Sequence, residues 1–254
     1  MKLEMIFFDM GGTIDLYPES EKCVTDACSK MKKILEEAGA EQISGQSENE
    51  FRETILKGLK KYTSWRTVDY IELLPEKLFS DFILKGSGID EGIINKVAED
   101  LAFLIDTGFF NRYPRPEAAE ALGAIRDKGI RMGIISNVMS RGQVGYCLDK
   151  YGLSDFFDPV VLSSVYGKRK PHPDIFHHAC ELAGVELSDI IYVGNSPIKD
   201  IGGAQKAGAG VTVFIDYFEN PPGDKGPVAD YSISDLRELL PIIDKVQKLC
   251  PCPS

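Results

Sequence analysis

The sequence lacks any apolar run near the length that a membrane span needs. A transmembrane helix takes about 20 consecutive apolar residues, and no stretch of this chain approaches that number. At the N-terminus, MKLEMIFFD is short and is interrupted by Glu4 and Asp9, so it does not have the pattern of a signal peptide. We therefore expect a protein of the cytoplasm with no membrane partner.

Basic residues are also scarce relative to acidic ones. The chain has 29 Lys and Arg against 39 Asp and Glu, which gives a formal net charge of −10 at pH 7. The phosphates of nucleic acid would repel this charge, which argues against general affinity for nucleic acid. The expected partner is a small molecule, and the sequence leaves open whether the chain is a monomer or a homodimer.

Cysteines that could form a metal site or a disulfide framework are missing as well. The six cysteines are scattered and form no CxxC pair. Only Cys250 and Cys252 lie close together, in the terminal CPCPS, and two thiols are too few for a structural zinc site. Reduced thiols in a cytosolic protein are the expected state.

From about residue 118 onward, helical patterns alternate with short apolar runs. The segments IRMGIIS, PVVLSS, IIYVG and VTVFI have the pattern of buried strands, as does MIFF near the N-terminus. Strands and helices in alternation predict an α/β fold, a Rossmann-like doubly wound parallel sheet covered on both faces. A last helix is expected over residues 234–249, with a possible break at Pro241.

Residues 17–112 have a different pattern, without a comparable apolar strand. Helices are expected over residues 22–39, 47–62, 74–86 and 90–106, and the polar stretch 39–49 is expected to be a flexible connection. The pattern predicts a helical insertion, residues 17–112, between the first strand and the rest of the sheet.

Polar residues suited to a phosphate or a metal ion follow four of the predicted strands. Asp9 follows MIFF, Ser136 ends MGIIS, a lysine-bearing loop follows VVLSS, and GNSPIKD follows IIYV. A single strand that ends in a polar residue is weak evidence, because turns need such residues anyway. Four in order predict a ligand site, since ligands of parallel sheets bind at the carboxyl ends of the strands.

In these motifs the sequence resembles the haloacid dehalogenase-like hydrolases that carry a helical cap after the first strand. The family's Asp-x-Asp-Gly-Thr loop is matched by residues 9–13, its second-motif Ser or Thr by Ser136, and its third-motif Lys by Lys170 in GKRKPHPDIF. The acidic fourth motif is matched by GNSPIKD, which contains Asp200. The resemblance spans nearly the whole chain and implies a core of residues 1–16 and 113–254 with a helical cap of residues 17–112.

The resemblance implies a phosphatase that acts on a small phosphorylated metabolite. Asp9 would attack phosphorus and form an aspartyl-phosphate, Ser136 would bind a phosphate oxygen, and Lys170 would neutralise negative charge. Glycines after the nucleophile would let backbone N–H groups come close to the phosphoryl group. The residues expected to bind substrate are Gly11, Gly12, Thr13, Asn137 and the cap residue Arg66.

A magnesium ion is the cofactor that the resemblance implies. The expected ligands are Asp9, the Gly11 carbonyl, Asp200 and Asn195. These are oxygen donors, which this hard cation prefers, and it would keep several waters besides.

Two positions depart from the family pattern. Gly11 stands where the family has the aspartate that protonates the leaving group, and such acid–base help is worth about 10²–10⁴ in rate. Asn195 stands where the fourth motif opens with Asp, which removes one negative charge and should weaken magnesium binding.

Two ways to compensate for the missing acid remain open. A leaving group that departs easily, such as that of an aryl or acyl phosphate, would need no acid. Otherwise a cap residue could help, with Trp65 beside Arg66 as part of the substrate-facing surface. The candidates are Lys57, Lys60, Lys61, Tyr62 and Arg66. Lys168 and Arg169, next to the catalytic lysine, are interpreted as solvated side chains.

Two other functions stay open. A dehalogenase would use Asp9 to attack carbon and release halide, although dehalogenases of this family carry an aromatic residue where Gly11 stands. A non-catalytic relative would bind a phosphorylated ligand or a protein without turnover. Retention of Asp9, Ser136, Lys170 and Asp200 together argues against the second alternative, because a binder needs no nucleophile.

Overall fold

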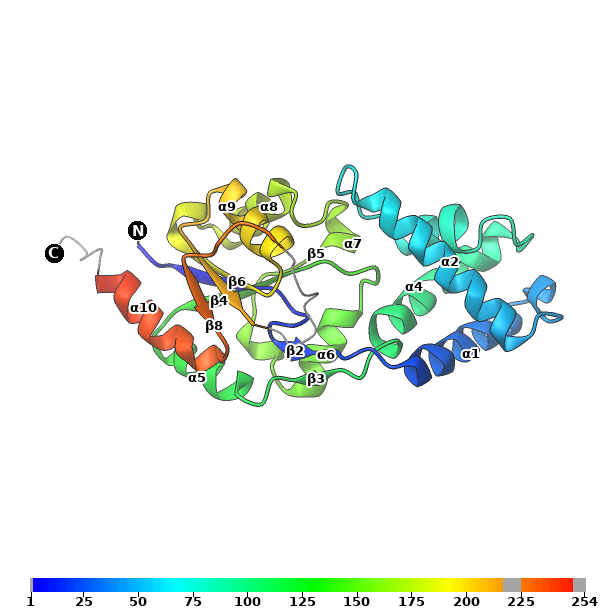
Figure 1. Ribbon diagram of the computed structural model, residues 1–254, viewed down its shortest axis with the longest axis horizontal. Coiled ribbons are helices and arrows are strands. Elements are labelled where there is room, and N and C mark those ends of the chain that lie inside the picture. Colours follow the sequence, from blue (N-terminus) through cyan, green and yellow to red (C-terminus); the bar gives the residue numbers. More distant parts are fainter. Residues whose placement is uncertain (1, 217–224, 249–254) are drawn as a thin grey trace.

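The computed structural model describes residues 2–216 and 225–248, which form an α/β core beside a bundle of helices (Figure 1). The strands are β1 Met5–Phe8, β2 Asp15–Leu16, β3 Tyr113–Pro114, β4 Arg131–Ser136, β5 Val160–Leu162, β6 Ile190–Gly194, β7 Val211–Ile215 and β8 Tyr231–Ile233. The α-helices are α1 Glu21–Glu37, α2 Glu48–Arg66, α3 Pro75–Leu78, α4 Glu91–Gly108, α5 Ala118–Asp127, α6 Gln143–Tyr151, α7 Ser163–Tyr166, α8 Pro173–Ala183, α9 Gly203–Ala207 and α10 Leu239–Lys248.

The main sheet is parallel throughout and has the order β5-β4-β1-β6-β7-β8. Strand β1 lies inside it, with β4 on one side and β6 on the other. All four residues of β1 are buried, which explains why this strand is an uninterrupted apolar run. The carboxyl ends of β4, β1 and β6 therefore meet at one edge of the sheet.

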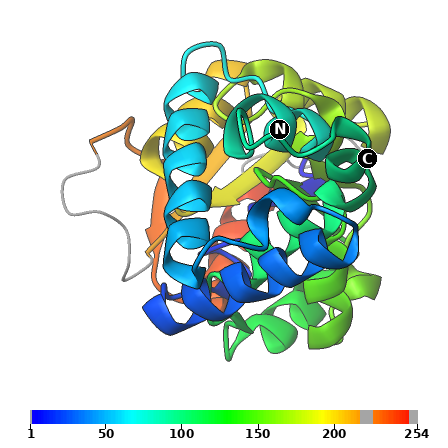
Figure 2. The same cartoon turned by 90° about the vertical axis from the view of Figure 1, so that its right-hand side faces the viewer.

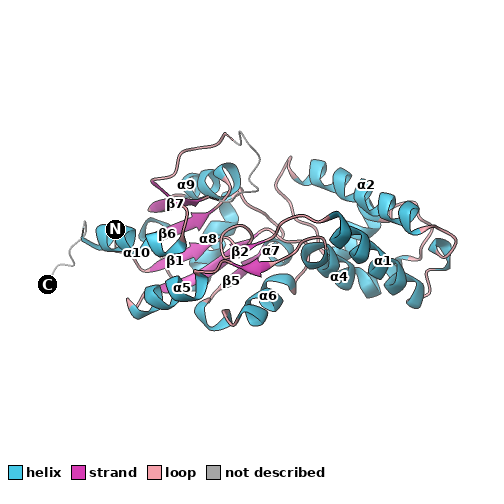
Figure 3. Ribbon diagram, turned by 60° about the horizontal axis from the view of Figure 1, so that its bottom comes forward, coloured by secondary structure: helices cyan, strands magenta, loops and turns pink. Residues whose placement is uncertain are grey.

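Helices cover both faces of this sheet (Figure 3). On one face Ile6 and Phe8 of β1 pack in a core shared with α5, α6 and α10. On the other face Met5 and Phe7 pack in a second core shared with α8 and α9. The alternation of β1 side chains between two cores confirms the predicted doubly wound α/β architecture.

The insertion has a hydrophobic core of its own. Buried residues from α1, α2 and α4 pack together there, among them Met31, Phe51 and Leu101. Figure 2 views the molecule from this side, with the insertion helices in front of the core. The amphipathic patterns of the predicted helices arise from burial in this separate core rather than against the sheet.

The chain enters and leaves the insertion through a two-stranded antiparallel ribbon. Strand β2 pairs with β3, so that Asp15 lies opposite Pro114 and Leu16 opposite Tyr113. The predicted domain boundaries after residues 16 and 112 fall at this ribbon, which supports them, although they remain a prediction.

Some expectations for local structure were wrong. The edge strand β8 was not predicted, because its three residues are too few to show a period. The polar stretch 39–49 contains a 3₁₀ turn, Glu41–Ile43, whose Ile43 is buried. Pro241 lies in the first turn of α10 and does not break it, because the early N–H groups of a helix need no intrahelical partner. The helix expected over 74–86 includes a π-helical segment, Phe79–Ile83, and a second π-helical segment, Pro197–Gly202, precedes α9.

None of the helices in the described part of the chain has the length and apolarity to span a bilayer. Cys250 and Cys252 lie outside the described residues, and the other four cysteines are free thiols.

Two glycine-to-alanine substitutions should change stability in opposite directions. A Cβ atom at Gly58 of α2 would lie 2.4 Å from the Ile83 Cα, a backbone atom that cannot move aside cheaply. Gly58→Ala should therefore lower the free energy of unfolding by about 1–3 kcal/mol. At Gly145 in α6 a Cβ would meet no atom within 4 Å beyond the backbone of its own helix, so Gly145→Ala should raise the free energy of unfolding by roughly 0.5–1 kcal/mol. Urea unfolding of both variants tests this, and stabilisation by Gly58→Ala would contradict the close approach of the two segments.

Candidate active site

The predicted nucleophile lies at the carboxyl end of the inner strand β1. Asp9 continues the ladder of the sheet, since its backbone N–H donates to the Val193 carbonyl over 2.9 Å. Its side chain is 15% exposed, so that it is enclosed but still reached from one side. Ser136 ends β4 next to it, and the loop after β6 lies on its other side.

The turn after Asp9 needs its glycines for two different reasons. Gly12 has φ +81°, a left-handed conformation that other residues adopt at a cost, and a Cβ there would lie 2.4 Å from the Asn195 side-chain nitrogen. At Gly11 a Cβ would lie 2.9 Å from Cε1 of Tyr17. The aromatic ring of Tyr17 thus lies against the position from which the family's acid would project.

Lys170 is buried and contacts the carboxylates of two other predicted motifs, Asp9 and Asp200. Its Nζ lies 2.8 Å from Asp9 Oδ1 and 2.6 Å from Asp200 Oδ1, and it donates to the Tyr192 hydroxyl over 2.7 Å. Tyr192 in turn donates to Asp200 Oδ1, and the Ser196 N–H donates to Asp200 Oδ2. The structure therefore brings Asp9, Lys170 and Asp200 into direct contact, although they lie far apart in the sequence.

Burial and the neighbouring charges shift the pKa values of the groups in this cluster. Burial raises the pKa of Asp9, an effect that the nearby Lys170 ammonium opposes and Asp200 reinforces. Burial alone would lower the pKa of Lys170, but Asp200 and Asp9 raise it overall, so the ammonium stays protonated. A protonated lysine at this place can neutralise charge on a nucleophile and on a bound anion.

Asn137 fixes the backbone that carries Lys170. Its amide nitrogen donates to the Lys170 carbonyl over 2.9 Å, and its amide oxygen accepts the Lys170 N–H over 2.8 Å. Both ends of the amide are thus engaged with the lysine loop. The structure gives Asn137 a positioning role, and its predicted contact with substrate remains a prediction.

A cavity of about 420 Å³ opens between the sheet edge and the insertion. Among the predicted site residues, it is lined by Asp9, Gly11, Arg66, Ser136, Asn137, Lys170 and Asp200. Gly12, Thr13 and Asn195 do not line it, and Thr13 is fully buried with no hydrogen-bond partner for its hydroxyl. The insertion contributes further lining from Tyr17, Leu59, Phe109 and Phe110.

Comparison with known proteins agrees with this geometry. The sequence model of the haloacid dehalogenase-like hydrolases matches residues 3–208. The chain belongs to this hydrolase family. A glyceraldehyde 3-phosphate phosphatase of Methanopyrus kandleri is 30% identical over 249 residues, which cover 97% of this chain and 99% of that protein.

Solved structures show the same fold for this haloacid dehalogenase-like hydrolase. A HAD phosphatase from Thermococcus onnurineus superposes with a TM-score of 0.59 at 24% identity, covering 95% of this chain and 98% of that chain. A 2-haloacid dehalogenase from Pseudomonas syringae gives a TM-score of 0.66 at 20% identity, covering 96% and 99%. At these identities the likeness extends to the fold and does not select between the two chemistries.

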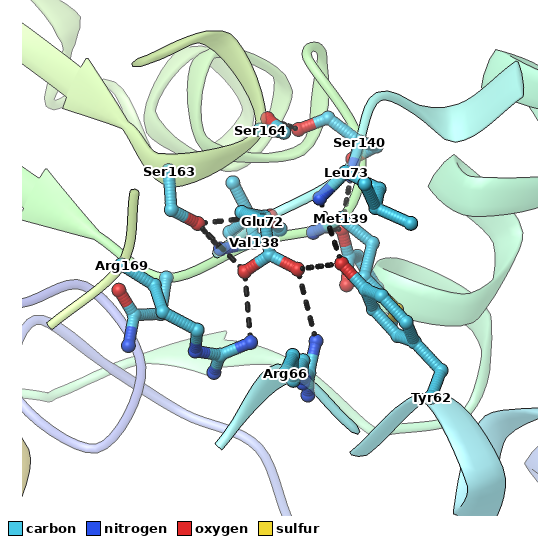
Figure 4. A network of polar contacts seen from close by, with 12 residues as sticks. Tyr62, Arg66, Glu72, Leu73, Val138, Met139, Ser140, Ser163, Ser164 and Arg169 are labelled. Carbon is cyan, nitrogen blue, oxygen red and sulfur yellow. Dashed lines mark hydrogen bonds and ion pairs between the residues drawn. The ribbon is translucent and has the colours of Figure 1, made fainter. Parts of the chain in front are cut away.

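A buried carboxylate that sequence reasoning missed links the insertion to the core of the hydrolase (Figure 4). The side chain of Glu72 is fully buried and accepts hydrogen bonds from Tyr62 and Arg66 of the insertion and from Ser163 and Arg169 of the core. Both arginines line the cavity. Arg169 is thus not the solvated side chain that was expected, because it forms a buried ion pair with Glu72. No local pattern marked Glu72, which lies in an irregular segment between α2 and α3.

Asp106 makes a second contact between the two units of this hydrolase. This carboxylate at the end of α4 accepts the N–H groups of Met139 and Ser140, over 2.9 and 2.7 Å, in the loop that follows Ser136. Burial raises its pKa to about 6, against the opposing effect of the two N–H donors. Asp106 also lines the cavity.

Most of the proposed substitutes for the missing acid are not at the site. Lys57, Lys60 and Lys61 are exposed, and neither they nor Trp65 line the cavity. Tyr62 is buried and donates to Glu72 over 2.6 Å. Of the insertion residues named from the sequence, Arg66 lines the cavity.

The donors at the site fit a magnesium ion. Asp9 and Asp200 line the cavity and share the single ammonium of Lys170, so the three side chains carry a net charge of −1. The described residues contain no group of three His, Cys, Asp or Glu side chains that could hold a metal. Two carboxylates and a backbone carbonyl, completed by water and substrate phosphate, are a usual magnesium environment. The ligand role of Asn195 remains a prediction.

Loss of the buried carboxylate of Glu72 at the junction should lower stability far more than loss of the partly exposed carboxylate of Glu76. Glu72→Gln leaves two buried guanidinium groups without their counter-charge, and the free energy of unfolding should fall by about 3–5 kcal/mol. Glu76→Gln is the matched control, because Glu76 also joins insertion and core, through the half-exposed Arg141. Its cost should stay within about 1 kcal/mol. Similar costs for both variants in urea unfolding would contradict the central place of Glu72.

The raised pKa of Asp106 predicts a pH dependence of stability. A carboxyl whose pKa rises from 3.8 to about 6 on folding binds its proton more tightly in the folded state. The resulting stability is fully present below pH 3.8 and is lost as the pH rises through 6. The unfolding free energy of wild type minus that of Asp106→Asn should fall by roughly 3 kcal/mol between pH 3.5 and 7.5. Asp100→Asn, at an exposed position of the same helix, is the control. If the difference between wild type and Asp106→Asn did not change with pH, the raised pKa of Asp106 would be refuted.

Proposed function

We propose that this hydrolase is a magnesium-dependent phosphatase that acts on a small phosphorylated metabolite through an aspartyl-phosphate. The observation that carries this proposal is the buried cluster of Asp9, Lys170 and Asp200 at the cavity floor. The name of the Methanopyrus kandleri relative, a phosphatase aligned over nearly the whole chain, supports the same reaction.

The residues suit nucleophilic attack on phosphorus. An Asp9 carboxylate oxygen forms the bond to phosphorus while the bond to the leaving oxygen breaks, and water later releases phosphate and restores the carboxylate. Lys170, held by Asp200 and Tyr192, faces the charge that develops on the phosphoryl oxygens. Ser136 lines the same cavity and is expected to donate to a phosphate oxygen.

Magnesium would be held by Asp9, the Gly11 carbonyl and Asp200, with Asn195 as a further candidate. When bound, the ion supplies positive charge to the transferring phosphoryl group. We further propose that the protein works in the cytoplasm, where its thiols stay reduced.

The leaving group has no carboxylic acid beside it at position 11. Gly11 offers only backbone there, and the ring of Tyr17 fills the adjacent space. We therefore expect faster turnover of esters whose leaving group departs without a proton, such as aryl phosphates, than of alkyl phosphates.

The Tyr17 ring also gives the dehalogenase alternative some support. Dehalogenases of the family carry an aromatic residue where Gly11 stands, and here an aromatic ring reaches that place from position 17. Release of chloride from 2-chloropropanoate, with no hydrolysis of phosphate esters, would favour this second function.

Hydrolysis of p-nitrophenyl phosphate tests the proposed function. Turnover should require magnesium, stop on addition of a chelator and return when magnesium is restored in excess. Asp9→Asn should reduce kcat by a factor on the order of 10⁴ or more, as expected for loss of a covalent nucleophile. Asp244→Asn, an exposed carboxylate on α10, is the control and should retain full turnover. Unchanged turnover in the Asp9 variant would sink the proposal.

A further inference from the structure

The Glu72 network brings two guanidinium groups to the cavity but only one carboxylate. Arg66 Nη1 lies 3.2 Å from Glu72 Oε1, and Arg169 Nη1 lies 2.8 Å from Glu72 Oε2. Each arginine carries five N–H donors, so one contact with Glu72 uses a small part of what it can donate. Both side chains line the cavity that also contains Asp9 and Lys170.

Glu72 is the one carboxylate in direct contact with both arginines. These contacts alone sum to +1, and the side chains of the arginines are only 16% and 11% exposed. Burial lowers the pKa of Arg169 and Arg66 lowers it further, whereas Glu72 and Asp106, which also lines the cavity, oppose this; the pKa stays below its ordinary value. The Tyr62 and Ser163 hydroxyls take up other acceptor positions of Glu72. An anion that entered the cavity would accept hydrogen bonds from the guanidinium N–H groups that Glu72 does not engage.

We propose that Arg66 and Arg169 form a binding site for a carboxylate group of the substrate, separate from the site for its phosphoryl group. The inference rests on the proposed phosphatase function and names the substrate class: a phosphate monoester that also carries a carboxylate. A carboxylate, with charge −1, adds less negative charge beside Glu72 and Asp106 than a second phosphate, with charge near −2. Guanidinium forks match the two oxygens of a carboxylate in geometry as well.

The positions of the two arginines allow them to select substrates that carry a carboxylate. Arg169 precedes the catalytic Lys170 in the core, and Arg66 ends α2 of the insertion. A carboxylate held between them would contact both units at once, and the substrate would bridge the same junction that Glu72 already bridges. Glu72 is a positioning residue in this arrangement, because it holds both guanidinium groups at the cavity wall.

Three phosphate esters with the same carbon skeleton provide the test. At the carbon far from the phosphate, 3-phosphoglycerate has a carboxylate, glycerol 3-phosphate a hydroxymethyl group, and glyceraldehyde 3-phosphate, named for the Methanopyrus kandleri relative, an aldehyde. Wild-type kcat/KM should favour 3-phosphoglycerate over each of the others by about 10- to 100-fold, the usual worth of a hydrogen bond to a charged group. A ratio near one would overturn the inference.

Variants of the two arginines test whether they cause the preference for 3-phosphoglycerate. Arg66→Gln and Arg169→Gln should each lower the 3-phosphoglycerate to glycerol 3-phosphate ratio about tenfold or more, mainly through KM. Arg66→Lys, which keeps the charge but not the fork, should lower it less. Arg141→Gln, at an insertion–core ion pair that does not line the cavity, should leave the ratio unchanged. Equal losses on both substrates in the glutamine variants would show that the arginines only hold the two units together.

The outcome can be told apart from failure of the proposed function. Asp9-dependent hydrolysis of p-nitrophenyl phosphate tests the nucleophile without any carboxylate on the substrate. If that hydrolysis is absent, titration calorimetry of the wild type with the same esters gives the preference as a ratio of dissociation constants. Should Arg169→Gln fail to fold, the wild-type ratio and the Arg66 variants still decide the matter.

Discussion

The site depends on one buried ammonium group. Lys170 lies between Asp9 and Asp200, and an ammonium buried to this extent is tolerated only when carboxylates compensate it. This requirement fixes several others. Strands β1 and β6 must be neighbours so that both carboxylates reach one point, and Asn137 must clamp the loop that delivers the lysine. The parallel sheet is therefore the frame on which the charge cluster is built.

A second buried charge cluster holds the insertion on this frame. Glu72 compensates cations from both units, Arg66 of the insertion and Arg169 of the core, as Asp9 and Asp200 compensate Lys170. The contacts of Asp106 with backbone N–H groups work in the same direction. In both contacts the carboxylate belongs to the insertion and accepts from donors of the core, and Glu72 also accepts from Tyr62 and Arg66 of the insertion. The cavity between the units is consequently walled by charges that are already partly paired, and a ligand adds to an existing network.

The sequence was most informative where a residue type is tied to a local pattern. Asp9 follows a predicted strand, Ser136 ends one and Lys170 lies in the segment after another, so their place at one edge of the sheet could be predicted before any contact was known. Arg169 and Glu72 escaped prediction because their roles come from each other, across 97 residues of chain. Strand β8 escaped because three residues carry no measurable period, and it is defined by its pairing with β7. Long-range ion pairs and short edge strands are properties of the assembled fold.

Gly11 shows how the two kinds of information have to be combined. From the sequence alone this glycine is a lost acid, and the simplest conclusion is a weakened enzyme. In the structure the space beside Gly11 is occupied by the Tyr17 ring, which also packs edge-on against Phe110 and beneath the Arg112 guanidinium, and Arg112 is held by the buried Asp15. A carboxylate at position 11 would have to displace that ring. The absence of the acid is therefore matched by the surrounding packing, so position 11 cannot be judged as an isolated substitution, and the aromatic wall at this point belongs to the shape of the site that a leaving group meets.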